Sequence, residues 1–193
     1  MTDFDTAPTT AIEDLSGDYE FDIAHTRIGF AARHAMVTSV RGAFNEFEGT
    51  AHLDAADPSR SSARVVLKVA SIDTGSEQRD GHLRSADFFD VETYPETTFV
   101  ATGFERVDDE EFRVTGDLTV KDVTKPVTVD LTFNGSARDP FGNLRAGFEG
   151  TATVNRKDWG LTWNAALETG GFLVSDKIKL EFDVSAVKLT ASA

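Results

Sequence analysis

Four histidines are the side chains best suited to bind metal or transfer protons in this chain of 193 residues. They are His25, His34, His52 and His82, and each falls in a different expected element. None has the His-x-His or His-x-x-x-His spacing that brings two imidazoles to one metal ion. Cysteine is absent, which excludes thiolate ligands and thiol nucleophiles. We therefore expect no metal site and interpret His82 as a hydrogen-bonded structural residue, with contact to a ligand headgroup as the alternative.

The serines offer no better basis for catalysis. Ser76 and Ser136 lie in glycine-containing turns without a neighbouring base. The chain has neither a Gly-x-Ser-x-Gly elbow nor a phosphate-binding glycine loop. We predict a protein that is not an enzyme and needs no cofactor. An enzyme acting on a small hydrophobic substrate remains an alternative.

The dominant pattern in the chain is an alternation of apolar and polar residues from position 111 onward. A period of two predicts β-strands with one face in an apolar interior and the other in water. Short Gly, Asp and Asn turns between the strands favour an antiparallel barrel. The apolar sets are Phe112, Val114, Leu118 and Val120; Val127, Val129, Leu131 and Phe133; Leu144, Ala146, Phe148, Ala152 and Val154; and Ile178, Leu180, Phe182 and Val184.

Earlier segments extend this pattern. Strands are expected at residues 18–23, 27–34, 40–53, 63–72 and 97–107, with a bend near Asn45 because Phe44 and Phe47 differ in parity. Residues 76–85 predict a short helix, and residues 35–38 a turn of helix. The link at 158–171 is expected to be partly helical, with Trp159 and Trp163 on one helical face. Residues 1–17 are expected to be a disordered arm, and residues 18–193 a single domain.

Composition narrows the range of functions that the chain could have. The net charge of −14 and the pI near 4.6 argue against nucleic-acid binding and against electrostatic docking on an anionic membrane. No apolar run is long enough to span a bilayer, and the first residues do not resemble a secretory signal, so we expect a cytoplasmic protein without stable membrane insertion. The chain contains fifteen Phe but only two Trp and two Tyr. Phe either fills a β core or also lines a ligand cavity, and both interpretations stay open.

Charged residues in two segments have structural and functional interpretations. Arg79, Asp80, Arg84 and Asp87 either form a polar rim or tie a surface helix to the barrel by ion pairs, and the second is favoured. Arg156 and Asp158, next to Trp159, are expected to form a buried salt link that closes one barrel end.

Four motifs carry a family resemblance. They are AHTRIGFAARH at 24–34, continuing through VRGAF at 40–44 and FEG at 47–49; RDGHLRSADFFD at 79–90; GDLTVKDVTKPV at 116–127; and RKDWGL at 156–161, followed by VSD at 174–176. In this order and spacing they resemble the YceI-like family, lipocalin-like barrels that bind polyisoprenoids. The resemblance covers roughly residues 18–189. It implies an all-β fold: an extended antiparallel lipocalin-like barrel of about eight strands, with one or two short helices against the mouth.

The resemblance also implies a function: non-catalytic binding, transport or storage of a polyisoprenoid or prenylquinone in an apolar cavity. A homodimer is suggested only by analogy. A solidly packed barrel serving as a stress-response or interaction module is the further alternative. Which face of each strand points inward stays open. In the strand expected at 97–107, Val100 and Phe104 are apolar although they lie on the face opposite to Phe99. The expected ligand-binding residues are Phe30, Phe44, Phe99, Phe112, Leu118, Leu131, Phe133, Phe148, Leu180 and Phe182, with Trp159 and His82 as further contacts.

Overall fold

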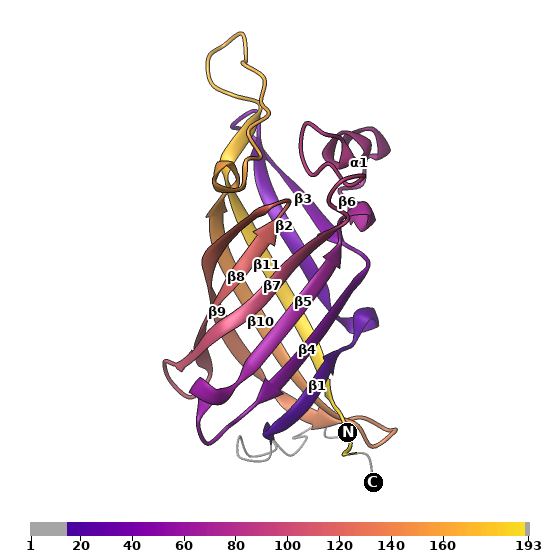
Figure 1. Cartoon of the computed structure of the whole chain (residues 1–193), viewed down its shortest axis with the longest axis vertical. Coiled ribbons are helices and arrows are strands. Elements are labelled where there is room, and N and C mark those ends of the chain that lie inside the picture. The colour runs from indigo at the N-terminus through magenta and orange to yellow at the C-terminus, as the bar shows by residue number, and fades with distance from the viewer. Residues whose placement is uncertain (1–14, 192–193) are drawn as a thin grey trace, which may run out of the picture.

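In the computed structural model, which describes residues 15–191, the chain forms an extended antiparallel β-barrel (Figure 1). Eight strands close the barrel, and further short strands and a single α-helix within the described residues complete the fold, as the sequence predicts. The strands are β1 (Gly17–Phe21), β2 (Arg27–His34), β3 (Thr38–Phe44), β4 (Phe47–Leu53), β5 (Ser62–Lys68), β6 (Ile72–Asp73), β7 (Glu96–Arg106), β8 (Glu111–Val120), β9 (Val123–Arg138), β10 (Leu144–Asn155) and β11 (Val174–Lys188). The helices are α1 (Glu77–Arg84) and the 3-10 turns η2 (Ile23–His25), η3 (Pro58–Arg60), η4 (Val69–Ser71) and η5 (Arg156–Trp159).

The barrel closes because β11 pairs along both of its edges. One edge pairs with β10, from Arg145 opposite Val187 to Asn155 opposite Lys177. The other edge pairs first with β2 and then, near its end, with β1, where Tyr19 lies opposite Lys188. The ring order is β1, β4, β5, β7, β8, β9, β10 and β11, with β2, β3 and β6 continuing from β11. The short strands β1 and β2 therefore share one edge of β11.

The predicted bend near Asn45 is confirmed. Strand β3 ends at Phe44 and β4 begins at Phe47. The backbone N–H of Asn45 donates to the carbonyl of Ser71, at 3.2 Å, instead of continuing a strand ladder. This bend lets the chain leave β2 and join β1 and β5.

The two ends of the barrel differ (Figure 1). We call the end that carries α1, the β2–β3 turn and the 160–173 link the upper end. The lower end carries η3 and the β9–β10 turn. Helix α1 confirms the helix expected at 76–85, and its N-cap is Ser76, whose hydroxyl accepts from the backbone N–H of Arg79.

Two local expectations at the upper end are wrong. Residues 35–38 form a tight hairpin turn rather than a helical turn, because Ala35 (φ 49°) and Met36 (φ 64°) take the left-handed conformation that matches the twist of paired strands. The 158–171 link is helical only at its first two residues, where η5 (Arg156–Trp159) ends at Gly160 (φ 77°), so the helical face expected for Trp159 and Trp163 does not form.

The start of the fold lies slightly earlier than expected. Leu15 is buried, Gly17 begins β1, and the Tyr19 hydroxyl donates to the Leu15 carbonyl at 2.8 Å. Residues 1–14 of the expected arm lie outside the described residues. No helix among residues 15–191 is long and apolar enough to cross a membrane.

Candidate functional site

The interior of the barrel contains two chambers. The upper chamber has a volume of about 300 Å³ and the lower chamber about 140 Å³. Pockets that bind small organic ligands start at roughly 300 Å³. The chambers meet at residues that line both of them: Phe21, Ala63, Phe104, Leu131 and Val184. The empty space therefore follows the long axis of the barrel.

The walls of both chambers are almost entirely carbon, because the strands of the barrel turn their apolar faces inward. In β11 the alternation of Ile178, Leu180 and Phe182 with Lys177 and Lys179 separates the lining from the outer surface. Leu180 and Phe182 are only half-buried although they lie inside the barrel. Such intermediate burial of interior side chains is the consequence of facing empty space rather than a packed core.

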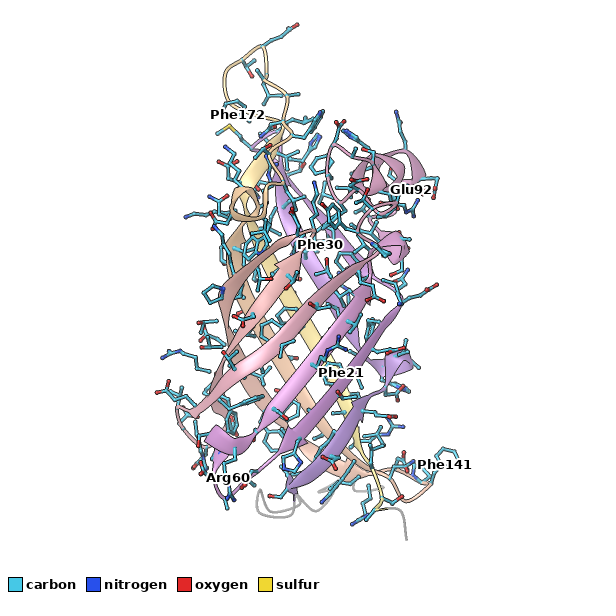
Figure 2. All side chains as sticks on the ribbon, in the orientation of Figure 1. Phe21, Phe30, Arg60, Glu92, Phe141 and Phe172 are labelled. Atoms are coloured by element: carbon cyan, nitrogen blue, oxygen red, sulfur yellow. The ribbon has the colours of Figure 1, made fainter. Side chains whose placement is uncertain are left out.

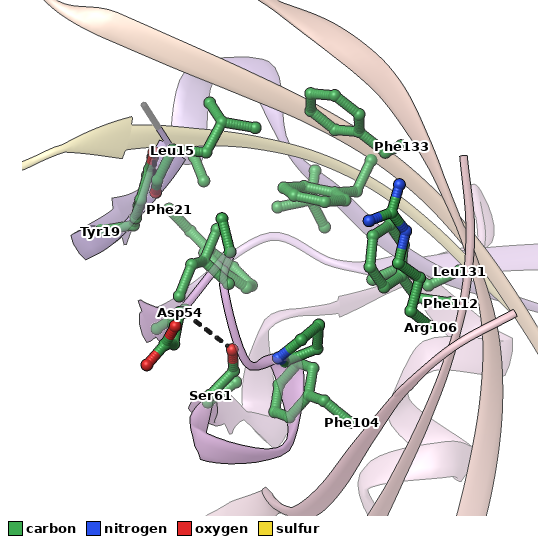
Figure 3. Close-up of a pocket in the computed structure, with 18 residues that line it drawn as sticks. Leu15, Tyr19, Phe21, Asp54, Ser61, Phe104, Arg106, Phe112, Leu131 and Phe133 are labelled. Atoms are coloured by element: carbon green, nitrogen blue, oxygen red, sulfur yellow. Dashed lines mark hydrogen bonds between the residues drawn. The ribbon is translucent and has the colours of Figure 1, made fainter. Parts of the chain in front are cut away.

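The lower chamber ends in a few polar groups (Figure 3). Tyr19 and Phe21 on one wall face Phe112 and Phe133 on the opposite wall. At the rim the backbone N–H of Asp54 donates to the Ser61 hydroxyl at 2.9 Å.

The phenol of Tyr19 takes no part in acid–base chemistry at neutral pH. Burial raises the pKa of Tyr19 to about 12. Its hydroxyl is already engaged with the Leu15 carbonyl. Tyr19 is thus a neutral wall residue that also fixes the start of the fold.

All predicted lining residues except His82 face these chambers. Those in the upper chamber are Phe30, Phe44, Phe99, Leu118, Trp159, Leu180 and Phe182; those in the lower chamber are Phe112, Phe133 and Phe148; and Leu131 lies in both. Phe133 and Phe148 lie opposite each other on β9 and β10, with ring centroids 5.4 Å apart. Most of these residues belong to the alternating apolar sets from which the sequence predicted the barrel.

A bulge in β7 explains why this strand has inward-facing residues of both odd and even number. Phe99 faces the upper chamber while Val100 is exposed. The register of β7 against β8 shifts between Ala101 and Gly103, so that one extra residue changes the parity. Phe104 therefore also points inward, and both Phe residues line the cavity.

Helix α1 and the turn after it cover the upper chamber. Leu83, Phe88 and Phe89 contribute to its wall. The sequence did not single these out as ligand contacts, although the adjacent Phe residues of the DFFD run were the available signal. Phe21 was also missed, because a five-residue strand shows too little alternation to assign a face.

His82 lies behind this wall rather than in it. Its Nε2 is 2.9 Å from Asp87 Oδ2, and its ring packs edge-on against Trp163 and Phe88, with centroids 4.5 and 5.1 Å away. Phe88 is the neighbour that reaches the chamber. His82 thus joins the segment after α1 to the 160–173 link.

The charged residues around α1 bind mainly to the segment at 70–74 that precedes the helix. Asp80 is buried and accepts hydrogen bonds from the N–H and the hydroxyl of Thr74. Arg79 donates to the same hydroxyl at 2.7 Å, and Arg84 donates to the Ala70 carbonyl at 3.0 Å. These contacts hold the helix in place over the chamber, largely without the ion pairs that the sequence favoured.

Arg156 fixes the 160–173 link to the barrel. Its side chain is only 4% exposed, and this burial lowers the pKa of the guanidinium. Nη1 donates to the carbonyls of Leu161 and Trp163 at 2.6 and 2.9 Å, and Nε to that of Ser175 at 2.9 Å. The expected salt link to Asp158 is wrong. Because the guanidinium points toward β11, its nearest carboxylate is Asp176, 3.6 Å away.

Trp159 closes the upper end from inside. Its side chain is buried, and its indole N–H donates to the Leu118 carbonyl at 3.0 Å. Among residues 15–191 no group of three or more His, Cys, Asp or Glu side chains could hold a metal ion. The geometry offers an apolar container with polar groups only at its ends.

The match to a known family covers nearly the whole barrel. The model of the YceI-like domain matches residues 19–186. This chain belongs to the YceI-like family. The resemblance inferred from the four sequence motifs is thereby confirmed.

Relatives of this YceI-like chain include two UPF0312 proteins. The one from Pseudomonas savastanoi pv. phaseolicola is 41% identical over 158 residues, which cover 81% of this chain and 82% of that protein. The one from Pseudomonas putida strain F1 is 37% identical over 185 residues, which cover 95% and 93%.

Solved structures similar to this YceI-like barrel cover most of it. BcnA of Burkholderia cenocepacia matches with a TM-score of 0.75 and 25% identity, over 86% of this chain and 98% of that one. The Campylobacter jejuni YCEI protein matches with a TM-score of 0.71 and 29% identity, over 82% and 90%. A polyisoprenoid binding domain from Saccharophagus degradans has a TM-score of 0.66 at 17% identity, over 89% and 98%, and shows the fold alone.

Proposed function

We propose that this YceI-like barrel binds a polyisoprenoid or a prenylquinone in its interior and carries or stores it without chemical change. The observation that carries the proposal is the carbon-lined space of the two chambers, which adjoin through five shared wall residues. A branched hydrocarbon tail is the class of ligand that gains most from such walls. The polyisoprenoid binding domain of similar fold supports this choice of ligand.

The energetics favour a tail without a charged anchor. Burying one methylene is worth roughly 0.8 kcal/mol, so an isoprene unit of five carbons contributes about 4 kcal/mol before ordering costs. A few units in the barrel thus account for tight binding. The few polar groups of the lower chamber, such as Asp54, Ser61 and Arg106, stand at its rim and leave the walls free for the tail.

The two alternatives have weaker support. A solidly packed barrel is at odds with the volume of the chambers. An enzyme would need a nucleophile or an acid–base pair at the cavity wall, and the wall residues among 15–191 are overwhelmingly hydrocarbon. The cytoplasmic location and the pairing of two copies remain predictions from the sequence.

Organic extraction of the purified protein followed by mass spectrometry tests the proposal. We expect an isoprenoid lipid in the extract, or uptake of added ubiquinone by protein that was first stripped of lipid. The lipid should be recovered with unchanged mass after prolonged incubation. Absence of both native lipid and uptake would refute binding, and a changed mass would show an enzyme.

A further inference from the structure

Three exposed apolar side chains gather at the upper end of the barrel. Met36 and Val37 form the β2–β3 turn and are 64% and 73% exposed, and Phe172 in the 160–173 link is 60% exposed. We call these three residues the apical patch. Phe141, the most exposed of the large apolar residues, lies at the lower end (Figure 2).

The backbone holds the apical patch together and away from the barrel. The N–H of Ala35 donates to the Leu173 carbonyl at 2.8 Å, which joins the β2–β3 turn to the link. Phe172 is fixed by its bridge to Ala166 across the tip of the link, and Met36 lies against Gly171. The patch is therefore a built surface made from two segments distant in the sequence.

The two segments that carry the apical patch are poor in carboxylates compared with the whole chain. Segments 33–41 and 162–175 together contain a single carboxylate, Glu168, in a chain with 33 Asp and Glu residues. Asp176, which follows directly, is paired with Lys157 at 3.1 Å. Below the patch Arg33, Arg41 and Lys177 point outward, because they alternate with residues that line the interior or face it. None of these three forms an ion pair with the part of the chain that the structure describes.

These cations lie on the strands that lead down from the apical patch. Arg33 hydrogen-bonds the Met36 carbonyl and the Ser39 hydroxyl, so it stands directly under the turn. Arg41 is four residues below Val37, roughly 13 Å along an extended strand. Apolar side chains of interfacial proteins enter a membrane by about 5–10 Å, and nearby Lys and Arg bind anionic headgroups.

We propose that the upper end docks reversibly on an anionic lipid surface through the apical patch and the cations below it. The patch enters the headgroup layer, and Arg33, Arg41 and Lys177 contact anionic headgroups. The local charge overrides the net charge of the chain because screening confines electrostatic attraction to about 8 Å at physiological salt. Ala32, Val174 and Ile178 line the upper chamber just below this surface, so docking brings the cavity close to a lipid reservoir.

Flotation with vesicles tests the docking without any knowledge of the cargo. The full chain should bind vesicles of phosphatidylcholine mixed with phosphatidylglycerol, and more weakly those of phosphatidylcholine alone or at high salt. We expect Phe172→Ser to reduce binding about tenfold, as loss of part of a buried Phe contact predicts. Lys177→Gln should reduce binding to the anionic vesicles about fivefold.

Matched controls lie at the other end of the barrel. Phe141→Ser removes a Phe that is even more exposed than Phe172, and Arg113→Gln removes a cation remote from the patch; neither should change vesicle binding. Equal effects of Phe172→Ser and Phe141→Ser would overturn the proposal, as would wild-type protein that does not float. Self-association that depends on Phe172, without vesicle binding, would assign the patch to a second copy instead.

The lack of cysteine permits a second, independent measurement. Val37→Cys and Phe141→Cys each provide a single attachment site for an environment-sensitive fluorophore. The probe at position 37 should shift to the blue when anionic vesicles are added, and the probe at position 141 should not. The opposite result, or shifts at both positions, would contradict docking by the upper end.

Discussion

A plug at the junction of the two chambers tests whether they hold one continuous tail. Ala63 on β5 is the smallest of the residues that line both chambers. Its neighbours at the junction include Phe104 and Leu131. Replacing Ala63 with Phe places a ring in the passage and leaves the upper chamber largely open. A long prenyl chain can then no longer extend into the lower chamber.

The expected loss follows from the carbon excluded. One isoprene unit is worth about 4 kcal/mol before ordering costs, which corresponds to roughly a thousandfold in affinity. Immobilising the tail offsets part of this, so we expect the affinity for a long-chain ubiquinone to fall between roughly tenfold and a hundredfold. A short-chain ubiquinone that fits the upper chamber should bind Ala63→Phe almost as well as the wild type.

Quenching of tryptophan fluorescence provides the assay, because Trp159 lines the upper chamber. Ala137→Phe is the matched control, since Ala137 is exposed on β9. The thermal unfolding of both variants establishes that they fold. Unchanged affinity of folded Ala63→Phe for the long chain would refute the continuous tunnel, and equal loss for both chain lengths would refute the division into chambers.

Three further predictions concern the walls and ends of the barrel. Phe148→Asp places an uncompensated charge in the lower chamber and should abolish lipid retention, whereas Phe148→Leu should keep it; mass spectrometry of organic extracts distinguishes them. Arg156→Gln removes the donors to Leu161, Trp163 and Ser175 and should lower the free energy of unfolding by about 3 kcal/mol, with faster proteolysis of the 160–173 link; unchanged protection would contradict the role of Arg156. Burial raises the pKa of Tyr19 from 10.0 to about 12, so the stability from its neutral phenol is complete below pH 10 and lost as pH rises toward 12. Tyr19→Phe should lack this alkaline decline in urea unfolding; an identical decline would show that Tyr19 is not its source.

Alternation along single strands is enough to predict the barrel and most of its lining. The inward set on β11, from Ile178 to Val184, is continuous and unambiguous in the sequence. Single-residue irregularities are what strand periodicity cannot resolve. The bulge between Ala101 and Gly103 reverses the parity of β7, and only pairing with β8 shows it.

Partners that depend on tertiary packing were also beyond the sequence. Arg156 was expected to pair with its near neighbour Asp158, but the turn of η5 directs the guanidinium toward β11 and Asp176. The helical face predicted for Trp159 and Trp163 fails for a related reason. The carbonyls of the link bind Arg156 instead of continuing a helix, and Gly160 ends the turn.

The most direct test of the central claim is a crystal structure of the protein saturated with a long-chain ubiquinone. The account predicts elongated density that runs from the upper chamber past Ala63 and Leu131 into the lower chamber. Side chains that fill both chambers, or a ubiquinone bound only on the outer surface, would contradict it.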